Sequence, residues 1–556
     1  MPGPGPDGFN LSTVFDTVAR AVPDQEVLVW RGRRLTYADM NARVDGLAHA
    51  LVAHGLGCHT GRDRLAGHES GQDHLGLYLR NGNEYLEAMV AGYRARVAPF
   101  NVNYRYVTEE LLHLLTDART RALVYHAEFA PQVAAVRDGL PELGLLVQVA
   151  DKSGHDLLPG AVDYEALLAT PAPAGGMPEP SGDDLFVLYT GGTTGMPKGV
   201  LWRNDDIYVT SMGGTPFGTT EPFTSYDAIA DAARAAGGGL RLLMVPPFMH
   251  GAAQWSTFHT ITGGGTVVLP DDVRRFDPAD ALRTAVRERV VSIPVVGDAV
   301  ARPLVEEIER GDYDLSGLAA VNNGSAPLTP GVRARLLDAL PHLLVMDAAG
   351  ASETGLQMSS LSARGMEADV ATFSPVPATT IVDDLFARVL EPGEGQGWLA
   401  QRGRVPLGYL GDAVKTARTF PVIDGVRFAI PGDRARYLDD GRIELLGRDG
   451  VTINSGGEKI FVEEVERALA AHPAVRDVVV VGRPSQRWGS EAVAIVQLAP
   501  EGAVSDAELL AEAGRHVARY KIPKAVVRVD VVERSPSGKA DYRWARERAV
   551  AAAVGG

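Results

Sequence analysis

Residues 189–199 read Tyr-Thr-Gly-Gly-Thr-Thr-Gly-Met-Pro-Lys-Gly, and they follow directly on the apolar run Leu185-Phe-Val-Leu188. Glycines let backbone N–H groups approach an anion closely, and threonine hydroxyls add hydrogen-bond donors. Lys198 adds a positive charge, so the stretch is typical of a loop that binds a polyphosphate. It is not a Walker A loop, because Pro197 and Gly199 flank the lysine where that motif requires Gly-Lys-Ser/Thr. A flexible surface turn is the alternative, and the preceding apolar strand argues against it.

Short apolar runs alternate with helical patterns on both sides of this loop. The expected strands are 185–189, 242–245 and 343–346, and the expected helices are 37–53 and 279–289. Thr36 stands at the N-cap position of the first helix, with Asp39 three residues later. This alternation predicts an α/β fold with largely buried strands, in which ligands bind where the strands end.

Three segments interrupt the alternation. Residues 57–74 and 171–184 are rich in Gly, Pro or charged side chains and are expected to be surface loops. The histidines of the first segment match no metal-ligand spacing. Residues 242–270 carry no Asp, Glu, Lys or Arg, but prolines and glycines interrupt them, so we interpret them as enzyme interior rather than a membrane span.

The last part of the chain has its own pattern, which predicts a separate small domain. The expected elements are a helix at 462–469, strands at 478–481 and 526–532, and a helix that follows Ser505 and includes Val517. Ser505 and Glu508 have the spacing of a capping box. Because Gly450 makes a hinge easy, we place the domain boundary between residues 1–448 and residues 449–556.

The composition is ordinary for a globular enzyme, with 556 residues, of which 45% are hydrophobic and 22% charged. Lys and Arg number 54 against 70 Asp and Glu, and the net charge of −16 argues against a general nucleic-acid binder. The single cysteine, Cys58, excludes an intramolecular disulfide framework and a cysteine-based zinc site. The N-terminus lacks the basic and apolar regions of a signal peptide, so a cytoplasmic location is expected.

Residues 189–199 resemble the phosphate loop of the AMP-forming adenylate ligases, which include acyl-CoA synthetases, luciferases and peptide-synthetase adenylation domains; Gly191 replaces the family's usual serine. Further motifs of this family follow in chain order: Gly324-Ser-Ala-Pro-Leu328, Gly350-Ala-Ser-Glu-Thr-Gly355, Pro431-Gly-Asp433, Leu446-Gly-Arg448, Ser455-Gly-Gly-Glu-Lys459 and Arg534-Ser-Pro-Ser-Gly-Lys539. The resemblance spans essentially the whole chain, and it is nearest to actinobacterial fatty-acyl- and steroid-CoA ligases.

The resemblance implies a large N-terminal adenylate-forming α/β domain and a small mobile α+β C-terminal domain, with ATP, Mg²⁺ and coenzyme A as ligands. It implies that ATP or AMP binds Thr190, Gly191, Gly192, Thr193, Thr194, Gly195, Lys198, Gly324, Ser325, Ala326, Asp347, Ser352, Asp433 and Arg448. The implied catalytic residues are Lys539, Glu353, Thr193 and His250, of which Glu353 and Thr193 would hold Mg²⁺. The loop of Ser455, Gly456, Gly457, Glu458 and Lys459 would face CoA.

The chemistry of these residue types fits the implied roles. The Asp433 carboxylate can accept two hydrogen bonds from the vicinal hydroxyls of a ribose. Lys539 would contact the substrate carboxylate and the α-phosphate, where charge develops in the transition state. Taken alone, Ser352 and Glu353 are typical of a helix cap, Lys539 of a solvated loop and Asp433 of a surface ion pair. Ala349 stands where the family has a tyrosine that stacks on adenine.

The acid-binding pocket is expected around Pro246-Pro-Phe-Met-His250, because the family's counterpart of this segment borders the substrate carboxylate. The small residues Gly251 to Ala253 and Gly263 to Gly265 would leave room for a bulky apolar acid. For Met249 and Trp255, a plain core position is the alternative.

The sequence therefore predicts an ATP-dependent ligase that activates a medium- or long-chain fatty acid, or another bulky apolar acid, through an acyl-adenylate. A steroid side-chain carboxylate is the alternative substrate, and a carrier-protein pantetheine is the alternative acceptor. The missing Gly-Lys-Ser/Thr disfavours a P-loop kinase, and the presence of Lys539, Glu353 and Asp433 disfavours a non-catalytic relative. No nucleic-acid partner and no transmembrane segment are expected, and the oligomeric state stays open, with a homodimer as one option.

Overall fold

The computed structural model describes residues 8–190, 197–216, 218–366, 372–455, 458–485, 489–500, 502, 504–534 and 538–554. Of the predicted site residues, Gly191, Gly192, Thr193, Thr194, Gly195, Gly456 and Gly457 lie outside these ranges, and their roles stay predictions.

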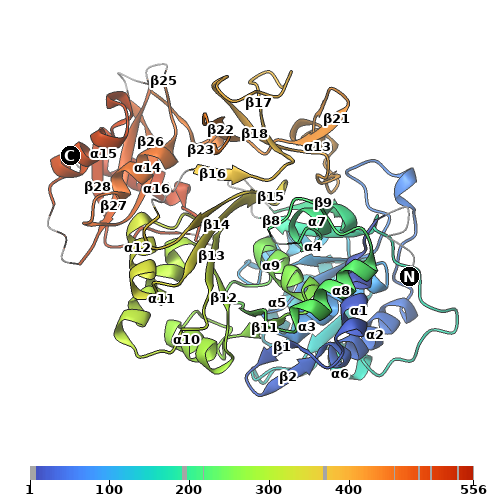
Figure 1. Cartoon of the computed structure of the whole chain (residues 1–556). Helices are drawn as coiled ribbons and strands as arrows, with labels where there is room; N and C mark the ends of the chain where they lie inside the picture. The colour runs from blue at the N-terminus through green and yellow to red at the C-terminus, as the bar shows by residue number, and fades with distance from the viewer. Residues whose placement is uncertain are drawn as a thin grey trace.

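Eight strands form the first sheet, in the order β19-β9-β8-β4-β3-β5-β6-β7 (Figure 1). They are β3 (His74–Tyr78), β4 (Ala98–Asn101), β5 (Thr120–His126), β6 (Leu145–Val149), β7 (Ala161–Asp163), β8 (Leu185–Thr190), β9 (Lys198–Arg203) and β19 (Gly408–Tyr409). Strand β9 runs antiparallel to β8 and β19, and the other neighbours are parallel. Every residue of β3 and β6 is buried, as expected of parallel strands that helices cover on both faces.

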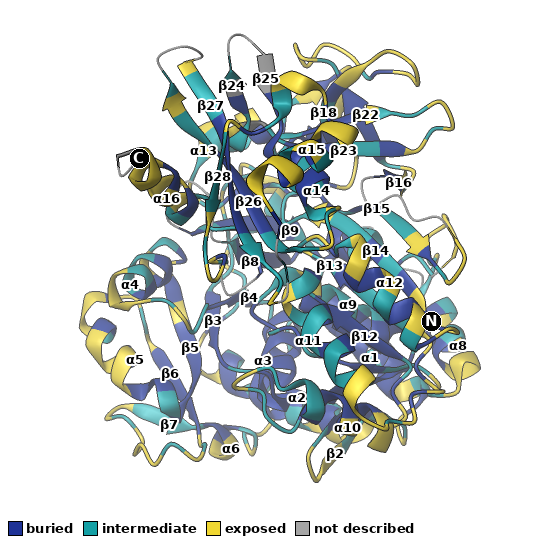
Figure 2. Cartoon of the chain, turned by 90° about the vertical axis from the view of Figure 1, so that its left-hand side faces the viewer, coloured by how far each residue is buried: buried dark blue, intermediate teal, exposed yellow. Residues whose placement is uncertain are grey.

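Side chains alternate between two cores along these strands. Leu75 and Leu77 belong to the larger core, with the first helices of the chain, whereas Tyr78 and Phe100 face the opposite core. The helices up to residue 262 are α1 (Leu11–Ala21), α2 (Tyr37–Ala53), α3 (Asn83–Arg94), α4 (Thr108–Asp117), α5 (Ala130–Val136), α6 (Tyr164–Leu167), α7 (Asn204–Ser211), α8 (Tyr226–Ala236) and α9 (Gly251–Thr262). Figure 2 shows the buried strands of this sheet beside helices such as α4 and α5, whose outer faces are exposed.

The second sheet begins with a largely parallel half, in the order β2-β1-β11-β10-β12-β13-β14-β15. Its elements are β1 (Glu26–Trp30), β2 (Arg33–Thr36), β10 (Arg241–Leu243), β11 (Thr266–Leu269), β12 (Ser292–Val295), β13 (Ala320–Gly324), β14 (Leu344–Ala351), β15 (Gly355–Ser362) and the helices α10 (Pro278–Arg287), α11 (Gly297–Arg310) and α12 (Pro330–Ala339). Strands β13 and β14 are parallel, so their carboxyl ends at Gly324 and Ala351 reach the same edge of the sheet.

The sheet then continues into an antiparallel part, in the order β16-β23-β22-β18-β21-β20, with β17 paired to β18. Its elements are β16 (Thr372–Pro375), β17 (Thr379–Val382), β18 (Gln396–Arg402), α13 (Ala413–Thr419), β20 (Val422–Ile423), β21 (Val426–Ala429), β22 (Asp433–Tyr437) and β23 (Ile443–Arg448). In Figure 1 this antiparallel part lies above the first sheet and above the parallel half of the second sheet.

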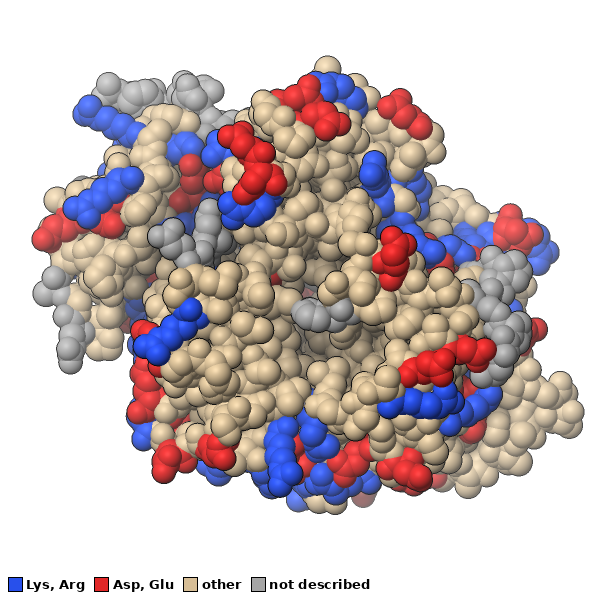
Figure 3. Space-filling model, in the orientation of Figure 1, with Lys and Arg blue, Asp and Glu red and all other residues tan. Residues whose placement is uncertain are grey.

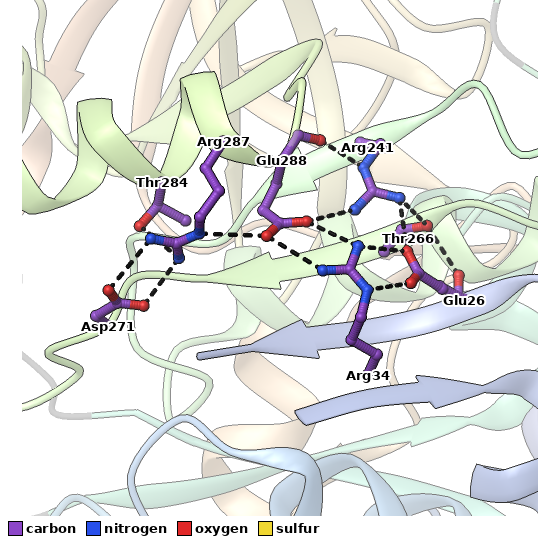
Figure 4. A network of polar contacts seen from close by, with 8 residues as sticks. All are labelled: Glu26, Arg34, Arg241, Thr266, Asp271, Thr284, Arg287 and Glu288. Atoms are coloured by element: carbon purple, nitrogen blue, oxygen red, sulfur yellow. Dashed lines mark hydrogen bonds and ion pairs between the residues drawn. The ribbon is translucent and has the colours of Figure 1, made fainter. Parts of the chain in front are cut away.

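A network of ion pairs joins the β1–β2 hairpin to β10 and to the end of α10 (Figure 4). Arg34 and Arg241 both donate to the carboxylates of Glu26 and Glu288. Arg287 joins Glu288 to Asp271, with N···O distances of 3.3 and 2.9 Å. The Glu288 side chain is 5% exposed, whereas Arg34 is 47% and Arg287 44% exposed, so only the central carboxylate is shielded from solvent.

The C-terminal part follows a short 3₁₀ turn, η4 (Asp449–Val451). Its elements are β24 (Ile453–Ser455), β25 (Glu458–Ile460), α14 (Val462–Ala470), β26 (Val475–Ser485), β27 (Gly489–Leu498), α15 (Asp506–His516), β28 (Ala525–Arg528) and α16 (Tyr542–Val554). Strands β26, β27 and β28 form a separate sheet with its own core against α14 and α15. Figure 1 shows this α+β unit beside the large domain, as the predicted fold class requires.

Several predicted elements are confirmed and others need correction. Helix α2 spans the predicted residues, and Thr36 and Asp39 form its capping box. The strand predicted at 526–532 ends at Arg528, since Val532 N–H donates to the Gln497 side chain and not to the strand ladder. The helix after Ser505 ends one residue early, with Val517 as its C-cap.

The predictions for the surface loop at 57–74 and for residues 242–270 also have different outcomes. His74 does not belong to the predicted surface loop: it begins β3, and Ser70 and the Ala118 carbonyl satisfy its ring, which allows burial. Residues 242–270 form β10, α9 and β11 in the protein interior, as predicted. None of the described helices is long and apolar enough to cross a membrane.

Candidate functional site

The glycine-rich stretch connects two antiparallel strands. Thr190 at the end of β8 pairs with Lys198 at the start of β9. The Lys198 ammonium contacts the carboxylate of Asp412 at 2.5 Å, and this contact lowers the pKa of Asp412. Asn101 fixes the end of strand β8. Its side chain accepts from the Tyr189 N–H and donates to the Tyr189 carbonyl, both at 2.8 Å. The predicted phosphate lysine thus stands at a fixed position at the edge of the first sheet.

Glu353 lies in the tight turn between β14 and β15. Its Oε1 accepts a hydrogen bond from the Tyr409 hydroxyl at 2.8 Å, and the Trp202 indole donates to the Ser352 carbonyl at 2.8 Å. Thr354 closes the turn by accepting from the Ala351 N–H at 2.9 Å. The Ser352–Glu353 pair is therefore part of a β-turn, and the helix-cap alternative is wrong.

The predicted adenine-side residues lie where β13 ends. Gly324 is the last residue of β13, Ser325 is exposed, and the backbone of Ser325 is left-handed with φ +67°. Asn323 fixes this end, because it accepts from the Gly297 N–H at 2.8 Å and donates to the Ala326 carbonyl at 3.1 Å.

Asp347 is tied to other protein groups. Its carboxylate accepts from Asn323 at 2.8 Å and from the guanidinium of Arg333, which is 4% exposed. These partners give Asp347 a structural part in joining β13, β14 and α12. Its predicted contact with a nucleotide stays a prediction.

Asp433 and Arg448 face each other across β22 and β23. Their side chains form an ion pair at 3.0 Å, and Asp433 raises the pKa of Arg448. The Arg448 N–H donates to Glu463 of α14 at 3.4 Å, so the pair also touches the C-terminal domain. Gly447, with φ +138°, allows this approach, because a Cβ there would stand 2.3 Å from the Glu463 carboxylate.

Lys539 comes from the C-terminal domain and reaches the same site. Solvent still reaches its side chain, but partial burial lowers the pKa of the ammonium. Arg448 also lowers this pKa, whereas the carboxylates of Glu353 and Asp433 oppose the change. Lys539 is therefore within electrostatic reach of the predicted Mg²⁺, ribose and nucleotide residues. The adjoining Gly538 packs on the large domain, where its Cβ would lie 3.1 Å from Val296 Cγ1.

His250 is the N-cap residue of α9, next to the apolar end of that helix. Burial lowers the pKa of His250 to about 4, and Arg105 and Lys539 act in the same direction, so the ring is neutral at pH 7. Its Nε2 is buried, and so is Nε1 of Trp255 on the first turns of α9; neither has a hydrogen-bond partner among the described residues. Both atoms lie on the segment where the substrate carboxylate is expected, so they are candidates for a contact with the acid.

The glycines Gly263 to Gly265 do not line this pocket, which corrects the sequence interpretation. They form the turn between α9 and β11, at the end of α9 remote from His250. A Cβ on Gly265 would lie 2.7 Å from the Leu240 carbonyl, and one on Gly264 would lie 3.1 Å from that of Ala233. Glycine is required there by the close approach of the backbone, not by the size of a substrate.

Three residues that position the predicted site residues were not identified from the sequence. Asn101, Tyr409 and Asp412 each bond a predicted site residue or the segment that carries it. One signal could have found Asn101, since it is a polar residue at the carboxyl end of an apolar strand, where α/β folds bind ligands.

One face of the molecule is hollowed (Figure 3). Figure 3 shows that this face is hollowed near its centre, and that uncharged residues make up most of the surface around the hollow.

Comparisons with known proteins agree with this geometry. Residues 15–410 match the model of the AMP-binding enzyme family, and residues 464–539 match that of the AMP-binding enzyme C-terminal domain. The medium-chain acyl-CoA ligase Mig of Mycobacterium avium is 57% identical over 547 residues, 98% of each chain. A 3-oxocholest-4-en-26-oate–CoA ligase of Rhodococcus rhodochrous is 38% identical over 97% of this chain and 96% of its own.

The fold recurs in a solved structure of low sequence identity. The crystal structure of the anthranilate CoA ligase AuaEII in complex with anthranoyl-AMP matches with a TM-score of 0.81, at 20% identity, over 99% of both chains. This likeness concerns the fold alone. The family model covers most of the chain and two full-length relatives exceed 30% identity, so the chain belongs to the AMP-binding enzyme family.

Proposed function

We propose that this protein is an AMP-forming acyl-CoA ligase. The observation that carries the proposal is the position of Lys539 from the C-terminal domain, within electrostatic reach of Glu353, Asp433 and His250 of the large domain. The two full-length relatives described above are both named as CoA ligases, which supports the same reaction.

In the first half-reaction, a carboxylate oxygen of the acid attacks the α-phosphorus of ATP. The bond from this phosphorus to the bridging oxygen of the β-phosphate breaks, and pyrophosphate leaves with the electron pair. Lys539 would hold the attacking carboxylate and the α-phosphate together, and Lys198 would contact the departing phosphates. Neutral His250 would border the carboxylate without adding a second positive charge.

A magnesium ion fits this site through Glu353. No group of three His, Cys, Asp or Glu able to hold a metal ion occurs within the described ranges. Mg²⁺ commonly binds through one or two carboxylates plus the phosphates of a substrate, and Glu353 offers such a carboxylate. The ion would neutralise phosphate charge, and Thr193 stays the second predicted ligand.

We propose a medium-chain fatty acid as the substrate, with a steroid side-chain acid as the alternative. The 57% identity to a medium-chain acyl-CoA ligase supports the first, and the 38% identity to a steroid-acid CoA ligase supports the second. Apolar or small side chains on the first turns of α9, next to His250, suit either acid.

In the second half-reaction, the CoA thiol would attack the acyl carbonyl, and AMP would leave. We propose that residues 449–556 turn about the segment near Gly450, which withdraws Lys539 and brings the loop 455–459 toward the site. The 3₁₀ turn η4 between the two domains supports a hinge at that place.

The test is release of AMP from the purified protein with ATP, Mg²⁺ and CoA. The acid panel contains short, medium and long fatty acids, aryl acids and steroid carboxylates. AMP formation that requires both an acid and CoA is expected, with medium-chain acids best. Acid-dependent pyrophosphate exchange without CoA turnover would instead identify a carrier-protein acceptor, and ADP as the product would refute the proposal.

A further inference from the structure

A second lysine stands beside the predicted phosphate lysine. Lys415 lies on α13, in the antiparallel part of the large domain. Its ammonium is 4.0 Å from the centre of the Tyr409 ring, a cation–π contact. The hydroxyl of the same tyrosine donates to Glu353 at 2.8 Å, so one aromatic side chain separates Lys415 from the predicted Mg²⁺ carboxylate.

Asp412 ties Lys415 and Lys198 into one unit. One carboxylate oxygen of Asp412 accepts from the Lys198 ammonium at 2.5 Å, and the other accepts from the Lys415 N–H at 2.9 Å. Thr416 adds a further contact, since its hydroxyl accepts from the Tyr409 N–H at 2.9 Å. The start of α13 is thereby fixed against β9 and β19, and the Lys415 side chain is held on the side of Lys198 and Glu353.

The charges around this unit do not balance. Among the described residues, no carboxylate lies within ion-pair distance of the Lys415 ammonium. Burial lowers the pKa of Lys415, and Lys198 lowers it further, whereas Glu353 and Asp412 oppose this change. Asp412 is the bonded anion of the Lys198 ammonium alone, since it meets Lys415 only at the backbone N–H. The Lys415 ammonium, held over the Tyr409 ring, is therefore a cation without a bonded carboxylate among the described residues, and such an arrangement favours binding of an added anion of high charge.

We propose that Lys415 is a second polyphosphate-binding lysine, which contacts the terminal phosphates of ATP and then the pyrophosphate that leaves. The inference rests on the proposed ligase function and assigns it a further residue. A lysine side chain has a flexible four-carbon stem, so the ammonium can turn from the Tyr409 ring to a phosphate oxygen without moving α13. Lys415 would stabilise the charge that pyrophosphate gains when its bond to the α-phosphorus breaks.

The test uses Lys415→Met, which keeps an unbranched apolar stem against Tyr409 and removes the charge. The expected result is a rise of about tenfold or more in the KM for ATP and in the pyrophosphate concentration needed for half-maximal reverse reaction, as for one lost charge-assisted contact. Conversion of pre-made acyl-adenylate and CoA to acyl-CoA involves no pyrophosphate, so its rate should stay within about twofold of wild type. Lys415→Arg should restore much of the pyrophosphate affinity.

Arg418→Met is the matched control, because Arg418 is an exposed cation on the same helix. It should change neither affinity. Unchanged pyrophosphate affinity in Lys415→Met would overturn the inference, and so would an equal loss in the thioester half-reaction, which would make Lys415 a purely structural residue. A wild-type protein that forms no AMP with any acid would contradict the proposed function itself, so the two failures are distinguishable.

Discussion

At the scale of single residues, Lys539 and His250 differ in charge, although both are expected to border the acid carboxylate. Lys539 is a cation beside Glu353 and Asp433, whereas His250 is neutral at pH 7, because burial lowers its pKa to about 4. A neutral imidazole can donate a hydrogen bond to a carboxylate. It adds no positive charge that would attract the carboxylate away from the α-phosphorus. In the proposed reaction, one charge and one dipole would thus orient the attacking carboxylate.

The first prediction concerns Lys539→Ala. Loss of a single donor that acts in the transition state should slow acyl-adenylate formation by about 10²- to 10³-fold. Formation of acyl-CoA from pre-made acyl-adenylate should stay nearly intact, because the proposed domain motion would withdraw Lys539 in that step. Single-turnover measurements of each half-reaction check this. Lys524→Ala, an exposed lysine of the same domain, is the control, and an equal loss in both half-reactions would contradict the assignment.

At the scale of elements, helix α9 presents a small residue where the acid is expected. Ala252 is exposed on the first turn, between His250 and Trp255. Residues three or four apart share a helix face, so Ala252, Trp255 and Ser256 lie together beside the predicted carboxylate position. The space above Ala252 would admit the first carbons of an acyl chain.

The second prediction is that Ala252→Phe shifts the preference toward shorter acids. A phenyl ring at this position would fill space that a medium chain needs, and each excluded methylene is worth about 0.8 kcal/mol of lost burial. We expect kcat/KM for a medium-chain acid to fall about tenfold or more, with a smaller loss for a short acid. Ala235→Phe on the exposed side of α8 is the control. A uniform loss over all chain lengths would contradict the pocket assignment.

The charge network of Figure 4 is a second feature at this scale, and it contributes stability, not chemistry. Burial raises the pKa of Glu288, but Arg34, Arg287 and Arg241 outweigh it and hold this pKa below the usual value. A carboxylate with a lowered pKa contributes stability above its unfolded value of 4.5, and the contribution is lost as the pH falls through the folded pKa.

The third prediction is that Glu288→Gln lowers the thermal midpoint by about 2 °C at pH 7, because Arg34, Arg241 and Arg287 lose the negative charge that they share. The difference from wild type should shrink as the pH falls below 4.5, where the wild-type carboxyl also becomes neutral. Differential scanning calorimetry at several pH values checks this, with the exposed Glu142→Gln as the control. A difference that grows toward acid pH would contradict the sign of the argument.

At the scale of the whole molecule, the two domains are held in the orientation that presents Lys539. Arg302 on α11 donates across the interface to the Arg476 carbonyl of β26 at 3.0 Å. Gly538, with φ +75°, packs against Val296 near the start of α11. These contacts belong to one orientation of the C-terminal domain, so under the proposed domain motion they would bias the protein toward acyl-adenylate formation.

The fourth prediction follows from this contact. Arg302→Ala should slow acyl-adenylate formation by about fivefold, the effect of one lost hydrogen bond on the population of this orientation. The thioester half-reaction should be unchanged or faster. Stopped-flow measurement of both half-reactions checks this, and Arg310→Ala at the exposed end of α11 is the control. A slower thioester step in Arg302→Ala would count against the proposed domain motion.

The amino-acid sequence by itself determined the fold class and the chain order of the motifs, and it predicts a polyphosphate-binding role for residues 189–199. These features are local: a strand pattern, a capping box such as that of Thr36 and Asp39, or a loop of glycine and threonine is written in neighbouring residues. The prediction failed where a residue's role depends on distant partners. Gly263 to Gly265 seemed by size alone to widen the pocket, yet Leu240 and Ala233 make them a tight turn.

Only the tertiary structure decided which of these groups meet. Lys198 and Asp412 are separated by 214 positions and Glu353 and Tyr409 by 56. Lys539 reaches Glu353 from the C-terminal domain. Such encounters are set by the register of β8 with β9, by the strand order of the second sheet and by the orientation of the C-terminal domain. No local pattern encodes these, because the free energy that selects them comes from burial summed over the whole molecule.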